Sequence, residues 1–455
     1  MDRNARSRQR QDRFRVGHRA RSAGAVEYFN MLTSRELLDT TEALMPEHRE
    51  RLYPPTVTLS MFLRQVLEAD GSCQKAVNGW AAQRAADGLS AMSVATAGYC
   101  RARQRLPLAM LSGLARETGR QLSARASARW RWRARMVKLV DGTGVSMPDT
   151  PANQAVYPQP CSQSPGVGFP QARLIAVICL ATGAALDAAI GAFSGKGSGE
   201  LGLLRTLGAA FERGDVMLAD AHYCNYFLIA TQLGAGVDVL FEQHGARISD
   251  FRRGQSLGSR DHLVNWRKPA HRPDWMSVEQ YAQFPAELRV REVKVERQVL
   301  VTTKLDQRAV SKDELSALYA RRWDVGLDLR NLKTTMGMEL LHCQTPQMNE
   351  KELWAHLLAY NLIRMLMAQS AHNAHLDPRQ ISFKHTLQLW TEWVSRGLSA
   401  TLDSGRLFVL IAQQTVRDRA GRIEPRMRKR RPKSFPWLKI PRAQARQQII
   451  LHRHQ

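Results

Sequence analysis

Two aspartates each stand at the end of a short apolar run, where acidic side chains can do chemistry at the edge of a sheet. Residues 137–140 predict a buried strand that ends on Asp141, and residues 216–219 predict another that ends on Asp220. If the two strands are neighbours, both carboxylates lie at one edge. Hard oxygen ligands favour Mg²⁺ or Mn²⁺, and two ions about 3.5–4 Å apart activate an attacking hydroxyl and stabilise a leaving one at a phosphodiester.

Each aspartate alone also has an ordinary structural interpretation. Asp141 can cap the turn at Gly142, and Asp220 can cap a helix. Capping accounts for either residue about as well as catalysis does, so the chemical interpretation depends on the two lying together. His222 and Tyr223 follow the second acid, where a supporting role and a purely structural role are both open.

A row of polar and basic side chains lies along residues 319–333. Its members follow one another at steps of three or four, which places them on one face of an α-helix: Tyr319, Arg322, Gly326, Arg330 and Lys333. Apolar residues recur at helical spacing beside them: Leu318, Val325, Leu329, Leu332 and Met336. The pattern predicts one amphipathic helix. Its glycine is unexpected, because glycine in a helix costs about 1 kcal/mol relative to alanine.

The segments around these residues predict an α/β protein. An apolar hairpin turns around Gly183, and helices alternate with strands up to residue 241. Charged and strand-like residues then suggest a β-rich insertion before the helices resume. We expect six regions: a basic arm (1–35), a helical DNA-binding domain (36–135), the first part of a catalytic core (136–243), the insertion (244–305), the second part of the core (306–372), and a C-terminal helical region with a basic tail (373–455).

One N-terminal helix has the composition of a DNA-reading element. Ser93 can cap a helix whose predicted exposed positions include Arg101, Arg103 and Arg105. A short helix rich in arginine could enter a major groove. A helical bundle with a solvated basic face has nearly equal weight, because charge runs are often only hydrated.

Composition points to a polyanionic partner. The 455 residues carry 66 Lys+Arg against 41 Asp+Glu, a formal net charge of +25, which favours nucleic acid. The six cysteines form no Cys-x-x-Cys pair, which indicates a reducing compartment and no structural zinc. The sequence predicts no secretory signal and no membrane insertion.

The spacing of these groups resembles a known family. Asp141, Asp220, a β-rich insertion and then Tyr319, Arg322 and Lys333 are similar to the DDE transposases of bacterial insertion sequences that carry a Tyr-Arg-Glu-Lys signature. The resemblance covers residues from about 40 to 435. It implies a ribonuclease-H-like (retroviral-integrase-like) catalytic domain with a β-rich insertion, preceded by an all-α DNA-binding domain.

The resemblance also implies a function and a set of partners. The expected activity is cut-and-paste transposition, with metal-dependent strand cleavage followed by strand transfer. The expected partners are double-stranded DNA, namely the element's terminal inverted repeats and its target, and Mg²⁺ or Mn²⁺. The resemblance further implies a homodimer on DNA and a cytoplasmic, nucleoid-associated location.

Individual roles follow the signature. Asp141 and Asp220 would be catalytic metal ligands, and Tyr319, Arg322 and Lys333 would contact phosphates at the element's end. Trp323, within the signature, can stack or pack, and packing is the expectation.

The departure from the family falls at the third acid, where glutamate is replaced by Gly326. Asp324 and Asp328 each lie two residues away, roughly 200° around the helix. Losing one of three carboxylates should be severe, because phosphoryl transfer depends on placing the metals. One hypothesis is therefore a protein that folds and binds DNA but is catalytically impaired. In the other, Asp324 or Asp328 reaches a metal through local unwinding at Gly326.

Two other classes of protein remain as alternatives. A DNA-binding regulator derived from a transposase would explain the basic regions and Gly326, but not two acids at one sheet edge. A structural nucleic-acid-coating protein would need only the charge, and would bind without sequence preference and with a steep salt dependence.

Overall fold

The computed structural model describes residues 44–45, 52–193, 195, 199–396, 404–416 and 436–453. The predicted basic arm (1–35) and the basic run of the tail (426–433) lie outside the described residues. In the part of the chain that the structure describes, no helix is both long and apolar enough to cross a membrane.

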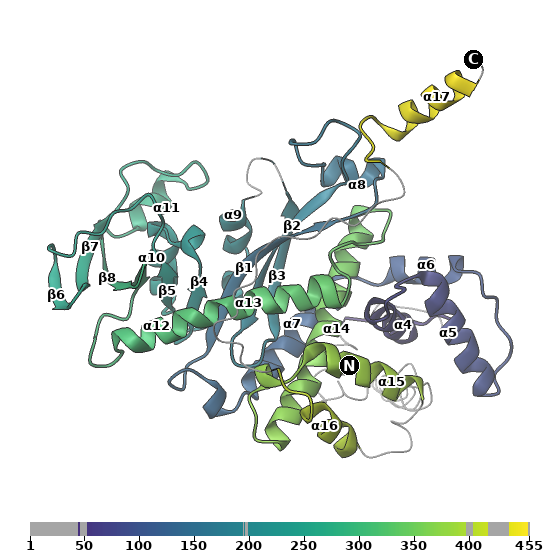
Figure 1. Cartoon of the computed structure of the whole chain (residues 1–455), viewed down its shortest axis with the longest axis horizontal. Helices are drawn as coiled ribbons and strands as arrows, with labels where there is room; N and C mark the ends of the chain where they lie inside the picture. Colours follow the sequence, from purple (N-terminus) through teal and green to yellow (C-terminus); the bar gives the residue numbers. More distant parts are fainter. Residues whose placement is uncertain are drawn as a thin grey trace, which may run out of the picture.

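A nine-stranded mixed sheet forms the centre of the molecule, with strand order β3-β2-β1-β4-β5-β9-β8-β7-β6 (Figure 1). In chain order the strands are β1 (Val137–Ser146), β2 (Gln171–Cys179), β3 (Ala185–Ala192), β4 (Val216–Ala219), β5 (Asp238–Glu242), β6 (Gln255–Gly258), β7 (Asp261–Arg267), β8 (Glu287–Val295) and β9 (Gln298–Thr302). Strands β1, β4 and β5 run parallel, and the remaining neighbours are antiparallel. The predicted α/β class is therefore confirmed.

The hairpin and the first strand show how local sequence sets this sheet. Strands β2 and β3 pair as predicted, with Gly183 at φ +74° in the turn, where glycine adopts the left-handed conformation at little cost. Strand β1 is longer than predicted: it passes through Asp141 and pairs with β2 up to Ser146. Pairing with β4 stops at Leu139, and the next backbone contact on that side of β1 is a bridge between Ser146 and Leu340.

The strands of residues 244–305 do not form a separate sheet. Strand β9 pairs with β5, through Leu240 opposite Thr302, and β8, β7 and β6 continue outward from it. Figure 1 shows these strands as a continuation of the central sheet, with α11 (Val278–Gln283) beside them.

The N-terminal helices share the main core. They are α4 (Pro55–Leu67), α5 (Cys73–Ala86), α6 (Ala97–Arg105) and α7 (Leu108–Ala124). Helices α4 and α7 pack on the long helix α14 (Pro346–Asn373), and apolar residues of all three belong to one buried cluster. A smaller cluster joins α4, α5 and α6. A separate all-α domain is therefore not confirmed.

Helices cover both faces of the sheet. Helix α14 and α7 lie on one face, and α9 (Glu200–Arg205) and α10 (Tyr226–Gly234) lie on the other. The remaining helices are α8 (Pro151–Val156), α15 (Phe383–Ser395), α16 (Ser404–Ala412) and α17 (Arg442–Arg453).

The helix predicted over residues 319–333 has three changes of hydrogen-bond pattern. Helix α12 (Lys312–Ala320) starts at a capping box formed by Ser311 and Glu314. A 3₁₀ turn (Arg321–Trp323), helix α13 (Asp324–Arg330) and a π turn (Asn331–Thr335) follow without a break in the helical path. The single uniform helix of the prediction is therefore wrong in detail, and such departures are frequent at functional sites.

Candidate active site

The parallel strands bring Asp141 and Asp220 together at one end of β4. Leu139 pairs with Leu218, so the residues two positions further along, Asp141 and Asp220, are the next neighbours. Asp220 follows β4 directly and keeps an extended backbone, with φ −83° and ψ −174°. The juxtaposition expected from the two strand ends is therefore present.

Backbone groups hold one oxygen of each carboxylate. The Gly142 N–H donates to Asp141 Oδ1 at 2.8 Å, and the His222 N–H donates to Asp220 Oδ1 at 2.8 Å. The turn and capping roles considered from sequence are thus real, and they coexist with the pairing of the two acids. Each carboxylate keeps its second oxygen for another partner.

The pKa of Asp141 is raised to about 6. Burial is the largest cause, and the negative charges of Asp220 and Glu200 add to it, against the lowering effects of the Gly142 N–H and the Arg322 guanidinium. A carboxylate held in this way is stabilised by a cation close to it.

The signature helix faces these acids through two residues. The positive charge of Arg322 acts on Asp141. The Tyr319 phenol is buried, donates to Glu242 Oε2 at 3.0 Å, and feels the charge of Asp220. Burial is the main reason that the pKa of Tyr319 lies well above its usual value.

Other residues of the signature lie further away. Lys333 is in the π turn, with its Nζ 3.9 Å from Glu339 Oε1. Trp323 is 60% exposed and lies under the Arg322 guanidinium, 4.2 Å from its ring centroid. The expectation that Trp323 packs into the protein is therefore wrong, and its ring stacks with the Arg322 guanidinium instead.

Gly326 leaves an open space at the position of the family's glutamate. It lies in α13, which packs on β1, and a Cβ placed on it would meet no atom within 4 Å. Arg322, one turn earlier, is the residue that acts on Asp141. A longer side chain at position 326 therefore has room on the helix that faces the acids.

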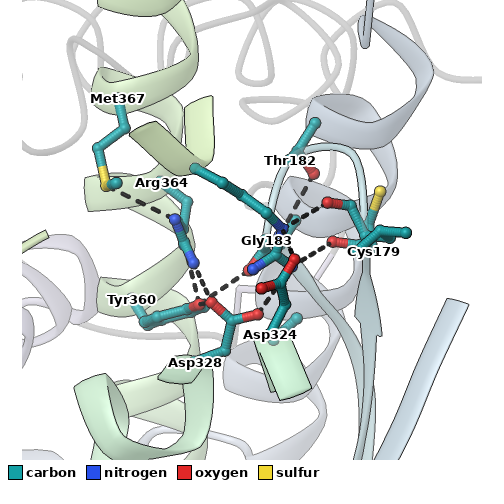
Figure 2. Close-up of polar contacts among 12 residues, drawn as sticks. Cys179, Thr182, Gly183, Asp324, Asp328, Tyr360, Arg364 and Met367 are labelled. Atoms are coloured by element: carbon teal, nitrogen blue, oxygen red, sulfur yellow. Dashed lines mark hydrogen bonds and ion pairs between the residues drawn. The ribbon is translucent and has the colours of Figure 1, made fainter. Parts of the chain in front are cut away.

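The two nearby aspartates of α13 are already paired elsewhere. Asp328 is fully buried and forms ion pairs with Arg364 and Arg379 and a hydrogen bond with Tyr360 (Figure 2). Asp324 pairs with Arg321 at 2.7 Å and lies 3.8 Å from Arg379. Either carboxylate would have to break these pairs to reach a metal ion, which argues against local unwinding as a replacement for the third acid.

Two glutamates near the site were not found from sequence. Glu242 ends β5, and the signal for it was the same as for the aspartates, an acid at the end of a parallel strand. Glu200 begins α9 and accepts from the buried Tyr223 phenol at 2.9 Å. Tyr223 therefore supports Glu200, whereas His222 is exposed. No local signal in the sequence connects Glu200 with the site.

The predicted DNA-reading helix keeps two of its three arginines at the surface. Arg101 and Arg105 are exposed on α6. Arg103 is buried: its guanidinium donates to Cys73 Sγ at 3.0 Å and lies over the Phe62 ring. The expectation of an exposed Arg103 is wrong, because position 103 shares the inner face of α6 with Tyr99.

The carboxylate oxygens of Asp141 and Asp220 are suitable ligands for one divalent cation. Both offer hard carboxylate oxygens, and burial together with the negative charges of Asp220 and Glu200 raises the pKa of Asp141. Among the described residues, no three His, Cys, Asp or Glu side chains converge closely enough to hold an ion. A cation held by this pair would complete its shell with water or phosphate oxygens, as Mg²⁺ commonly does.

Asp141→Asn is expected to stabilise the protein at pH 7.5 by up to about 3 kcal/mol. The folded chain holds the Asp141 proton more tightly than the unfolded chain, because the pKa rises from 3.8 to about 6. Ionisation of Asp141 therefore costs stability as the pH rises from about 4 through about 6. Urea unfolding at about pH 4 and at pH 7.5 measures the effect. A stability difference that does not shrink towards pH 4 would contradict it.

Comparisons with known proteins relate this chain to transposases. Residues 132–362 match the family model described as the transposase DDE domain. The chain is 28% identical over 358 residues to the transposase InsG of insertion sequence element IS4 from Escherichia coli (strain K12), covering 75% of this chain and 78% of that protein. A cryo-EM structure of the piggyBac transposase synaptic complex with hairpin DNA aligns with 87% of this chain and 86% of its own, at 10% identity and a TM-score of 0.43. The matched residues span half of the chain and include both aspartates and the helix that faces them, and the chain belongs to the transposase DDE domain family.

Proposed function

We propose that this protein is the DNA transposase of an insertion sequence, which binds terminal inverted repeats and catalyses metal-dependent strand cleavage and strand transfer. The observation that carries the proposal is the placement of Asp141 and Asp220 side by side, opposite a helix that carries Arg322 and Tyr319. This combines a cation site with groups that bind phosphate.

Each side chain then has a defined task. Asp141 and Asp220 hold a divalent cation, Mg²⁺ or Mn²⁺, which when bound polarises phosphodiester oxygens and activates the attacking hydroxyl. Arg322 orients a phosphate of the element's end through charge-assisted hydrogen bonds. Tyr319 turns its hydroxyl from Glu242 to donate to the same phosphate. Lys333 lies further along the same helical path, where it contacts a more distant phosphate.

Gly326 reduces the rate of this chemistry. In the family pattern a glutamate supplies a third carboxylate here, and this chain supplies no side chain. Positioning of the ions is the main source of catalysis in phosphoryl transfer. The proposed transposase therefore binds DNA normally and cleaves it slowly.

The DNA partner follows from charge and from the reaction. A net charge of +25 favours binding of the DNA backbone. The exposed Arg101 and Arg105 on α6 are proposed to contact the terminal repeat. Two element ends must be joined, so we propose a homodimer on DNA that acts in the bacterial cytoplasm at the nucleoid.

DNA carrying the element's own end is expected to be retained in a gel-shift assay at about 200 mM salt, with at least about a hundredfold preference over a scrambled duplex. Asp220→Asn serves as a matched variant, because it removes a charge at the cation site and no contact to the repeat. It should bind as well as the natural chain and cut nothing. Equal retention of the two duplexes would contradict the proposal and favour a coating protein.

Gly326 also supports a second candidate, a catalytically inactive, sequence-specific DNA-binding protein derived from a transposase. Both candidates predict specific retention of the element's end. They differ in metal-dependent nicking of that DNA, which the second candidate lacks entirely.

A further inference from the structure

Strand β5 places a third carboxylate in line with the two aspartates. Ala219 pairs with Phe241 in the parallel β4–β5 ladder, so the next residues, Asp220 and Glu242, are neighbours. Asp141, Asp220 and Glu242 therefore form a row across three adjacent parallel strands, about 4.8 Å from one strand to the next. An inference from this row rests on the function proposed above.

Burial of the preceding residues indicates which face of the sheet the row lies on. Side chains alternate between faces along a strand. Leu139, Leu218 and Leu240 all belong to the buried cluster on the α14 side. Two residues further along each strand the same face is presented, so the row faces the helices that carry Tyr319 and Arg322.

Glu200 is close in space but lies on the other face. Its carboxylate packs against the α-carbon of Gly142, where an added Cβ would stand 2.7 Å from Glu200 Oε1. Gly142 presents the face opposite to that of Asp141. Glu200 thus raises the pKa of Asp141 through its charge without belonging to the row.

Glu242 is half-buried, and among the described residues its hydrogen-bond donors are neutral. Tyr319 donates to Oε2 at 3.0 Å, and Gln298 donates to the same oxygen at 3.1 Å. Both donors are neutral, and no Lys, Arg or His among the described residues forms an ion pair with Glu242. In a chain with an excess of cations, an acid that faces Asp220 without a basic partner suits a bound cation.

We propose that Glu242 is a metal-holding residue of this site, which shares a divalent cation with Asp220. Mg²⁺ is commonly bound through one or two carboxylates, with water and phosphate oxygens completing the shell. Two adjacent pairs, Asp141 with Asp220 and Asp220 with Glu242, then give two ion positions along the row. Neither position needs three converging side chains.

In this arrangement the ion held by Glu242 lies apart from the ligand position that Gly326 leaves empty. Helix α13 packs on β1, so a carboxylate at position 326 would approach the Asp141 end of the row, whereas Glu242 stands at the opposite end. The chain therefore retains two ions, but the second lies beyond Asp220 and does not replace the missing ligand beside Asp141.

Mn²⁺ binding to the full chain without DNA tests the proposal, by titration calorimetry and electron paramagnetic resonance at pH 7.5. The natural chain should bind two ions. Glu242→Gln should lose one ion or at least about tenfold in its affinity. Glu200→Gln, the matched carboxylate on the other face, should stay within about twofold of the natural chain.

The other outcomes distinguish a failure of the role of Glu242 from a failure of the proposed function. If Asp220→Asn loses both ions while Glu242→Gln keeps both, the role of Glu242 is overturned and the cation site stands. Equal losses in Glu242→Gln and Glu200→Gln would show that negative charge near the site, and not ligation by Glu242, sets the affinity, which also overturns the role of Glu242. If the natural chain binds no Mn²⁺, or Asp220→Asn binds it unchanged, the proposed site itself fails. Matching thermal unfolding curves in each variant show that the fold is intact.

Discussion

Gly326→Glu is expected to raise Mg²⁺-dependent cleavage of DNA carrying the element's own end by about a hundredfold or more over the natural chain. The change supplies a third carboxylate on the helix that faces Asp141, at a position where a Cβ meets no neighbouring atom within 4 Å. It also replaces glycine inside a helix with a better helix former. The gain is therefore expected without a cost in folding.

Gly326→Gln separates charge from helix propensity in that experiment. Glutamine has the same length and a similar helix propensity, but no negative charge to hold a cation. Single-turnover cleavage should stay at the level of the natural chain in Gly326→Gln and rise only in Gly326→Glu. If the natural chain already cleaves as fast as Gly326→Glu, position 326 is not the third ligand and the proposed impairment is wrong.

Asp328→Asn is expected to lower the free energy of unfolding by about 3–5 kcal/mol. Asp328 is fully buried and is the shared partner of Arg364 and Arg379, whose side chains are 4% and 10% exposed. Removing its charge leaves the buried Arg364 guanidinium without its carboxylate (Figure 2) and leaves Arg379 only the more distant Asp324. Arg379 also donates to the backbone of the β2–β3 turn, at Leu180 and Cys179, so the loss reaches several elements.

The matched control is Glu392→Gln, the same change of carboxylate to amide at the surface. Glu392 and its partner Arg396 are 68% and 70% exposed, and such pairs contribute less than about 1 kcal/mol. Urea unfolding followed by circular dichroism compares the two variants. Similar small losses in both would contradict the role of Asp328 in fixing α13 against α14.

Local sequence patterns were sufficient to predict the features that depend on interactions between residues close together in the chain. The hairpin around Gly183, the short strand before Asp220 and the helical path through Arg322 follow from apolar periodicity and turn residues, and the structure contains them. The pairing of Asp141 with Asp220 was also accessible, because strands that end in acids share an edge when they are neighbours.

The remaining features depend on which elements pack together. The row that includes Glu242 requires the order β1-β4-β5, which strand propensity does not specify. Arg103 was expected at the surface, yet α6 turns this position towards Phe62 and Cys73. The sequence left Asp328 open as a metal ligand. Its buried arginine partners come from residues more than 30 positions away, so local sequence does not reveal them.

The most direct test of the central claim is a change of metal preference at Asp220. In the Gly326→Glu background, Asp220→Cys replaces a hard oxygen ligand with a softer sulfur, which binds Mg²⁺ poorly and tolerates Mn²⁺ better. Cleavage of the element's end by this double variant should be lost in Mg²⁺ and recover at least in part in Mn²⁺. Unchanged cleavage in Mg²⁺ would contradict the claim that Asp141 and Asp220 hold the cation that drives the reaction.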